Sequence, residues 1–414
     1  MSIIVEARTA QPVDRAERMD VLDVIRGFAV FGILLMNIVP FSGAMMFNLG
    51  DAASLPGARF DRAGEFFLEF FAHAKFYSLF SLLFGVGFAI FLDRAFARGA
   101  DPARLFRRRL TGLLIIGLVH SIFIWFGDIL NVYALLGFLL LPFRRSSNRT
   151  LLVWGFVACA APILIYGVAL LVAIAAGVRA EPAAGEGLPP FLVDAIHAFA
   201  GGTYLDVLRG NLVFTGAGWV RRIVTLFILR MFGMFLLGIW AHRVGLFREP
   251  ARHRELLGRV CLWSFVLGAP ASALGAWMHD PGVQFIPDVR GFVWTILLCV
   301  GSTGLCFFYA SGLTLLFQKP AWRARLLVLA PVGSMALSNY LLQSLLAIPI
   351  FYGLGFGLFN HVSVVVALAI ACVIFAAQVV ISKVWASRAA YGPAEWLWRQ
   401  FTYQRRFPLW RPAE

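Results

Sequence analysis

The sequence predicts an all-α, polytopic integral membrane protein with about ten transmembrane helices and both termini in the cytoplasm. Hydrophobic residues make up 60% of the 414 residues and charged residues only 14%, against about 25% charged residues in an ordinary soluble domain. The mean hydropathy is +0.80. A soluble chain of this composition would expose a large apolar surface, whereas a bilayer requires apolar side chains at lipid-facing positions.

Ten apolar segments are candidates for the membrane spans, because a helix needs about 20 such residues to cross the hydrocarbon core. They lie at 22–44, 69–93, 109–127, 129–143, 151–177, 222–241, 259–278, 290–317, 326–357 and 362–386. The fourth is short. The ninth contains Gly353, Gly355 and Gly357 near its end, so we expect a kink or an irregular segment there.

The arginines predict the orientation of these spans. Basic clusters precede the first span (Arg8, Arg15 and Arg18), fill the 94–109 segment and recur in every second connection up to the residues after span ten. Short basic segments stay in the cytoplasm. The alternate connections are poorer in arginine and contain acidic residues, so an even number of spans with both ends inside is self-consistent.

The predicted organisation has five parts. These are a cytoplasmic segment 1–21, a membrane half 22–177, an outer loop 178–221, a second membrane half 222–388 and an interfacial tail 389–414. The outer loop begins with Glu181 and Glu186 and then has two amphipathic pieces, which either cap a cavity or form a passive connector. The tail combines Trp396 and Trp398 with arginines, which is typical of an interfacial anchor.

The net charge of +14 does not indicate nucleic-acid binding, because the basic residues occur in clusters between apolar stretches. That pattern is typical of loops held against anionic lipid, so the lipid bilayer is the expected partner. The five cysteines all lie within apolar stretches, without metal-ligand spacing. We therefore expect no disulfide framework and no metal, and a homodimer is left open.

His120 and Asp128 are the strongest candidates for chemistry. Ionisable side chains inside a span are costly and are functional hypotheses by default. His120 lies in the outer half of the third span, and Asp128 follows eight residues later at the turn. A carboxylate can orient an imidazole and raise its basicity. The alternative is that His120 is a packing residue and Asp128 caps the next helix.

Other polar side chains are expected near this pair. The predicted topology places Asn37, His73, Lys75 and Tyr133 in the outer half of the bilayer as well, so these residues are expected to line one cavity with His120 and Asp128. Lys75 has an alternative role, which is to extend to the outer surface.

Polar groups in later spans add further candidates. Asn339 and Gln343 share one face of the ninth span, one turn apart. Arg230 lies inside the sixth span and needs a partner, for which Asp128 is one candidate.

Several sequence blocks together resemble the YeiB family of bacterial inner-membrane proteins. They are LDVIRGFAVFGILLMNI, KFYSLFSLLFGVGFAIF, GLVHSIFIWFGDILNVYALLG, SMALSNYLLQS and GPAEWLWRQFTY. The resemblance covers nearly the whole chain. It implies a location in the bacterial inner membrane and a place in a wider transmembrane acyltransferase superfamily, which includes the lysosomal heparan-alpha-glucosaminide N-acetyltransferase.

That resemblance implies an acyl-CoA donor from the cytoplasm and a small-molecule or glycan acceptor on the outer face. In the lysosomal enzyme the catalytic histidine follows an asparagine near the end of the first span. Asn37 matches this asparagine, but residues 38–72 contain no histidine. Either His73 or His120 fills the role, or this branch performs different chemistry.

Two functions follow from these observations. In an acyltransferase, His120 with Asp128 would act as the base, Asn37 would stabilise the oxyanion, and Arg26, Arg107 and Arg108 would hold the donor phosphates. The alternative is a small-molecule transporter or permease, because ten spans with glycine-broken helices and mid-membrane polar groups suit a pathway. Against the permease, the sequence has no obvious inverted repeat.

Overall fold

The structure is a computed structural model that describes residues 19–44, 54–177, 189–279 and 287–411. Within these ranges the chain is all-helical and has no β-strand. The predicted basic residues Arg8, Arg15 and Arg18 and the acidic start of the outer loop, Glu181 and Glu186, lie outside the described residues.

The helices follow one another with short connections. The first half contains α1 (Asp20–Ser42), α2 (Asp61–Phe67), η4 (Leu68–Ala72), α3 (Lys75–Ala97), α4 (Pro102–Val119), η5 (His120–Ile124), α5 (Leu130–Leu140) and α6 (Asn148–Ala175). The second half contains α7 (Pro190–Gly201), α8 (Tyr204–Val224), α9 (Phe227–Val244), α10 (Arg254–Trp277), α11 (Val289–Phe317), α12 (Pro320–Leu326), α13 (Ala330–Ser334), α14 (Ala336–Phe351), α15 (Val364–Arg388) and α16 (Pro393–Tyr403).

Seven helices among the described residues are long and apolar enough to cross a membrane, and an eighth crossing is formed if the bent pair Pro320–Ser334 and Ala336–Phe351 counts as one. The chain is therefore a multi-pass membrane protein. The predicted count of ten is not confirmed. α4 begins with four arginines in eight residues, and α5 has 11 residues, about 16 Å of helix where the hydrocarbon core is about 30 Å thick.

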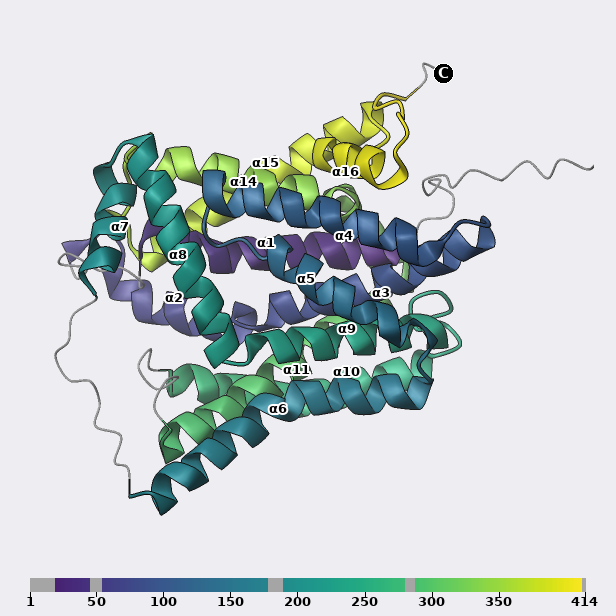
Figure 1. Ribbon diagram of the computed structural model, residues 1–414, viewed down its shortest axis with the longest axis horizontal. Helices are drawn as coiled ribbons and strands as arrows, with labels where there is room; N and C mark the ends of the chain where they lie inside the picture. The colour runs from purple at the N-terminus through teal and green to yellow at the C-terminus, as the bar shows by residue number, and fades with distance from the viewer. Residues whose placement is uncertain (1–18, 45–53, 178–188, 280–286, 412–414) are drawn as a thin grey trace, which may run out of the picture.

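The helices run roughly side by side, with α1 inside the bundle (Figure 1). α1 packs on α3, α11, α13, α14 and α15. In contrast, α6 and α10 expose large apolar side chains, such as Leu171 (67% exposed) and Trp263 (60% exposed). Side chains of this kind are suited to lipid contact. Figure 1 also shows α7 and α8 at one end of the bundle and α16 at the other.

Small residues bring α3 and α9 together. A Cβ atom on Gly85 would lie 2.0 Å from the carbonyl oxygen of Phe235, and one on Gly238 would lie 2.0 Å from that of Leu82. Only glycine permits this backbone approach, which is common where membrane helices pack. Of this pair, α3 lines the cavity described below.

The predicted ninth span is broken earlier than its glycines indicated. The two helical pieces meet at 77°, and the break is at Met335, which lies outside helical geometry (φ −121°, ψ 38°). The glycines follow the end of α14 in an irregular segment. Because Glu395 on α16 accepts hydrogen bonds from the backbone N–H groups of Leu337 (2.7 Å) and Ser338 (3.2 Å), it satisfies the free donors at the start of α14.

Candidate functional site

The connection between α4 and α5 positions the predicted histidine. The backbone N–H of Trp125 donates to the carbonyl oxygen of His120 (2.7 Å), a bond over five residues. Consequently α4 ends in the wide turn η5 instead of a regular helical turn, a feature that is frequent at functional sites. The chain then reverses through Gly127 and Asp128 and enters α5.

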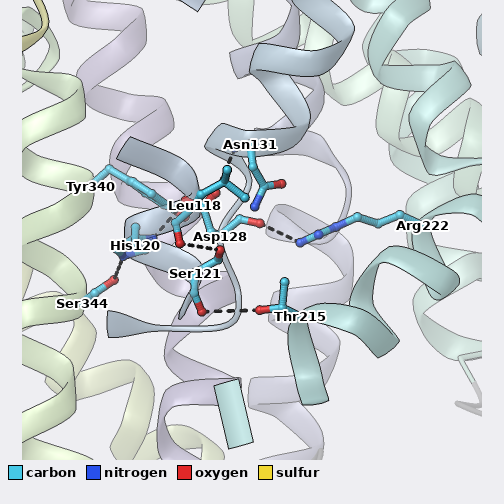
Figure 2. A network of polar contacts seen from close by, with 9 residues as sticks. All are labelled: Leu118, His120, Ser121, Asp128, Asn131, Thr215, Arg222, Tyr340 and Ser344. Carbon is cyan, nitrogen blue, oxygen red and sulfur yellow. Dashed lines mark hydrogen bonds and ion pairs between the residues drawn. The ribbon is translucent and has the colours of Figure 1, made fainter. Parts of the chain in front are cut away.

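His120 is held between a carboxylate and a hydroxyl (Figure 2). Its Nδ1 lies 2.9 Å from Asp128 Oδ1 and its Nε2 lies 2.9 Å from Ser344 Oγ. All three residues are buried, with at most 1% exposure. An ionised carboxylate only accepts hydrogen bonds, so Nδ1 of His120 donates to Asp128. In the neutral imidazole Nε2 is then the acceptor, and the hydroxyl of Ser344 donates to it.

Asp128 has two roles at once. One carboxylate oxygen pairs with His120, and the other accepts the backbone N–H of Asn131 (3.0 Å) at the start of α5. The hydroxyl of Tyr340 lies 3.5 Å from Asp128 Oδ1. The helix-capping role and the histidine-orienting role, which the sequence left as alternatives, are both present in the structure.

Helix α8 supports this turn from outside. At η5 its side chains donate to three successive carbonyl groups that have no helical partner. The pairs are Thr215 to Ser121 (3.4 Å), Asn211 to Ile122 (3.1 Å) and Tyr204 to Phe123 (2.8 Å). Arg222 donates to the backbone oxygen of Asp128 (2.8 Å), as Figure 2 shows. Helix α8, which begins with the second predicted amphipathic piece of the 178–221 segment, therefore secures the His120 turn.

A cavity of about 320 Å³ approaches the same place from the other end of the bundle. Residues of α1, α3, α4, α5, α13, α14 and α16 line it. One end has the arginines Arg26, Arg94, Arg98, Arg109 and Arg399. The other end has Phe80, Ile129, Tyr133 and Tyr340. Tyr340 also contacts His120, with ring centroids 5.3 Å apart, so this side chain lies between the cavity and the buried histidine.

The arginines at the mouth differ in part from the predicted ones. Arg26 lines the cavity and pairs with Asp23 (2.8 Å). Arg107 and Arg108, the other two predicted phosphate ligands, do not line it. Their neighbour Arg109 does, because successive helical residues point about 100° apart and the inner face of α4 contains Phe106, Arg109 and Leu113. The guanidinium of Arg109 lies 3.7 Å from the Trp398 ring centroid.

His73 and Lys75 belong to a different cluster. Nδ1 of His73 lies 2.6 Å from Glu69, and Glu69 also approaches His279 (3.8 Å). Lys75 is buried and donates to the backbone oxygen of Glu69. Neither residue lines the cavity or contacts His120. The prediction of a single cavity with all of these side chains was therefore wrong, because depth in the membrane does not determine which helices adjoin.

Of the remaining predicted residues, one lines the cavity and the others lie elsewhere. Tyr133 lines the cavity and bonds to Ser81 (3.0 Å). Half-buried Asn37 forms no hydrogen bond with a described residue, so the structure gives it no link to His120. Asn339 and Gln343 share one face, as predicted, but they bond to Gln378 between α14 and α15 and do not line the cavity.

Arg230 does not pair with Asp128. Its guanidinium donates to Ser302 on α11 and lies 5.8 Å from the ring centroid of Tyr77.

Comparison with known proteins finds one family model and several similar bacterial proteins. Residues 241–405 match the family model described as protein of unknown function (DUF418). Protein YxaH of Bacillus subtilis is 33% identical over 405 residues, covering 95% of this chain and 96% of its own. YeiB of Escherichia coli is 30% identical over 418 residues, covering 95% and 98%. The chain belongs to the YeiB-type family.

A third relative also matches this chain over almost its whole length. The 39.9 kDa protein in the amylase 3' region of Bacillus acidopullulyticus is 32% identical over 409 residues, covering 96% of this chain and 97% of its own. The names of these relatives state no activity. The family model begins after α8; it therefore includes Ser344 but not His120 or Asp128.

Sequence reasoning missed the roles of Ser344, Arg399 and Arg222. Ser344 lies one turn after Tyr340 on α14, and 224 residues separate it from His120. No local pattern distinguishes it from other serines in apolar helices. Arg399 was assigned to a lipid anchor, and only the packing of α16 on α4 places it at the mouth of the cavity.

Proposed function

We propose that this YeiB-type protein is an acyltransferase of the bacterial inner membrane. It would move an acyl group from a cytoplasmic acyl-CoA donor to a small-molecule or glycan acceptor at the outer face. The observation that supports this proposal most is the position of His120 and Asp128 behind Tyr340, which lines a cavity that five arginines also line.

The cavity suits an acyl-CoA donor in charge and in shape. Arginine is the preferred side chain for phosphate groups, and five arginines line the cavity. Apolar side chains line the interior. Arg109 on α4 and His120 at the start of η5 are eleven residues apart, roughly 16 Å along the helix axis. An extended pantetheine chain would run from the arginines toward Tyr340 and bring the thioester next to His120.

The chemistry assigned to His120 is that of a general base. Asp128 keeps the proton on Nδ1 and stabilises the imidazolium that forms when Nε2 takes up a proton. The acceptor would enter from the end formed by α7 and α8. A hollow of about 750 Å³ there includes Asp194, His197, Asp206 and Arg209 among its lining residues, and such groups are suited to bind an acceptor rich in hydroxyl groups.

The test is acyl-CoA binding and turnover by the purified full-length protein in detergent. Acetyl-CoA, octanoyl-CoA and palmitoyl-CoA serve as probes, and release of the CoA thiol is measured. We expect saturable binding that weakens about tenfold or more in Arg109→Gln/Arg399→Gln, since each lost charge-assisted hydrogen bond costs about 1.5–3 kcal/mol. The matched control is Arg107→Gln/Arg108→Gln. Equal affinity in both double variants, or no saturable binding, contradicts the proposal.

A permease is the second candidate, and the 77° break between α13 and α14 favours it. Broken helices in transporters surround substrate sites near the midplane of the membrane. This function predicts substrate flux in proteoliposomes without release of CoA thiol. Release of CoA thiol that is lost in His120→Ala favours the acyltransferase instead.

A further inference from the structure

Ser344 differs from the buried hydroxyl groups that bond within their own helix. In an apolar helix a serine hydroxyl usually donates to the carbonyl oxygen four residues earlier. Ser78, Ser311 and Thr314 follow this rule, with distances of 2.7, 2.6 and 2.6 Å. Ser344 does not. Among the described residues its hydroxyl has one hydrogen-bond partner, Nε2 of His120 at 2.9 Å.

The arrangement around Ser344 is that of an activated nucleophile. A hydroxyl lies within hydrogen-bond reach of a base, and a third group orients that base. Here Ser344, His120 and Asp128 come from α14, η5 and the turn before α5, and both hydrogen bonds are 2.9 Å long. The same order of groups is found on unrelated folds and is recognised by its geometry, not by chain position.

The position of Ser344 relative to the cavity fits this role. Tyr340 lines the cavity, and Ser344 follows it by one turn on the same face of α14. Both side chains therefore face the α4–α5 connection. Ser344 itself is 1% exposed, so the side chain of Tyr340 must rotate before a thioester reaches the hydroxyl.

We propose that Ser344 is a catalytic nucleophile that receives the acyl group before the acceptor does, a two-step route that rests on the acyltransferase function proposed above. In the first step His120 Nε2 takes the hydroxyl proton, Ser344 Oγ attacks the thioester carbonyl, the C–S bond breaks, and the CoA sulfur leaves with that proton. The product is a serine ester.

In the second step the acceptor hydroxyl or amine gives its proton to His120 and attacks the ester carbonyl. The ester C–O bond breaks, and Ser344 Oγ takes the proton back from His120. The acyl group leaves on the acceptor, and the chain returns to its starting state. The route needs no oxidant, reductant or metal, and donor and acceptor need not be bound at the same time.

The experiment combines covalent trapping with turnover. The purified protein is incubated with acetyl-CoA, octanoyl-CoA or palmitoyl-CoA without acceptor, denatured, digested and analysed by mass spectrometry. We expect an acyl adduct on the peptide that contains Ser344. The adduct should be absent from Ser344→Ala and His120→Ala, and release of CoA thiol should fall by roughly 10²-fold or more in Ser344→Ala. Ser311→Ala, in which the lost hydroxyl bonded only within its own helix, should keep both properties.

A second variant keeps the proposal testable if Ser344→Ala fails to fold. Ser344→Cys retains a nucleophile, so its adduct becomes a thioester that neutral hydroxylamine cleaves, whereas the wild-type ester resists that treatment. An alkyl fluorophosphonate, which labels serines activated by a histidine, is a probe that does not depend on the donor.

The outcomes separate the two proposals. Turnover in Ser344→Ala within tenfold of the wild type, with no adduct in the wild type, overturns the nucleophile and leaves the acyltransferase intact. A second outcome is that the fluorophosphonate labels Ser344 in a way that depends on His120, while acyl-CoA is not turned over. This outcome supports the nucleophile and overturns the acyl-CoA donor. If Ser344 is not labelled and acyl-CoA is not turned over, both the nucleophile and the acyl-CoA donor are overturned.

Discussion

His73–Glu69 and His120–Asp128 are two of the histidine–carboxylate pairs in this bundle, and they differ in how they are built. His73 and Glu69 are four residues apart, on one local turn between η4 and α3. His120 and Asp128 are eight residues apart and meet only because η5 and the following turn reverse the chain. The first pair is local in sequence, whereas the second requires the packing of α4 on α5.

The surroundings of the two pairs differ as well. The side chains of His73 and Glu69 are 25% and 12% exposed, and the partners near them are charged or ionisable: His279 and Lys75. The side chains of His120 and Asp128 are 1% and 0% exposed, and the second imidazole nitrogen faces a serine hydroxyl. A histidine–carboxylate pair becomes suited to proton transfer when a reactive group lies on its far side. Only the second of these two pairs meets that condition among the described residues.

The largest expected effect separates the two histidines. His120→Ala removes the base and should lower acyl transfer by roughly 10²- to 10⁴-fold. His73→Ala should lower it less than tenfold, because His73 does not line the cavity. The measurement is the rate of CoA thiol release by protein that elutes as a single species in size-exclusion chromatography. A greater loss in His73→Ala than in His120→Ala would reverse the assignment.

Asp128→Asn tests the orientation of the imidazole and should lower the same rate by roughly 10²-fold. Asparagine can still cap α5 through its oxygen, so the fold is retained. Its NH₂ group then faces Nδ1 of His120 and favours the tautomer with the proton on Nε2, which cannot accept the proton of Ser344. Glu69→Gln is the matched control in the other pair. Normal turnover by Asp128→Asn would refute the role of the carboxylate.

Gly117→Ala tests the packing beneath the site. A Cβ atom there would lie 2.5 Å from the backbone nitrogen of Asn131 and 2.9 Å from Asp128 Oδ2. Overpacking of this kind should lower the free energy of unfolding by about 1–3 kcal/mol and displace Asp128. The control is Gly258→Ala on α10, where a Cβ atom has no neighbour within 4 Å. Thermal unfolding in detergent measures both, and equal melting temperatures would contradict the described contact.

The smallest expected effect concerns the support of α14. Glu395→Gln removes the negative charge at the start of this helix, where it is stabilising, and should lower the free energy of unfolding by about 0.5–1 kcal/mol. Glu255→Gln removes a carboxylate whose partner Arg259 is 70% exposed and should change little. Thermal unfolding in detergent again provides the readout. An effect of Glu255→Gln larger than that of Glu395→Gln would show that the cap is unimportant.

The sequence by itself determined the membrane class and most helices. Apolar length and composition suffice for that, because a helix satisfies its own backbone hydrogen bonds in lipid. The pairing of His120 with Asp128 was also accessible, since both lie on one short connection. The number of spans could not be predicted from the sequence, because α4 and α5 are apolar over only part of the required length. Their place in the bundle depends on their neighbours.

Only the tertiary structure decided what surrounds the histidine. Ser344 reaches His120 across 224 residues, Arg222 and Asn211 reach the same turn from α8, and Arg399 reaches the cavity from the tail. Each of these contacts depends on which helices adjoin and on the direction in which each one faces. A local sequence pattern specifies the apolar faces of a helix, but many partners can cover such faces equally well. The polar contacts, which require matched atoms at hydrogen-bond distance, are formed only once the bundle has packed.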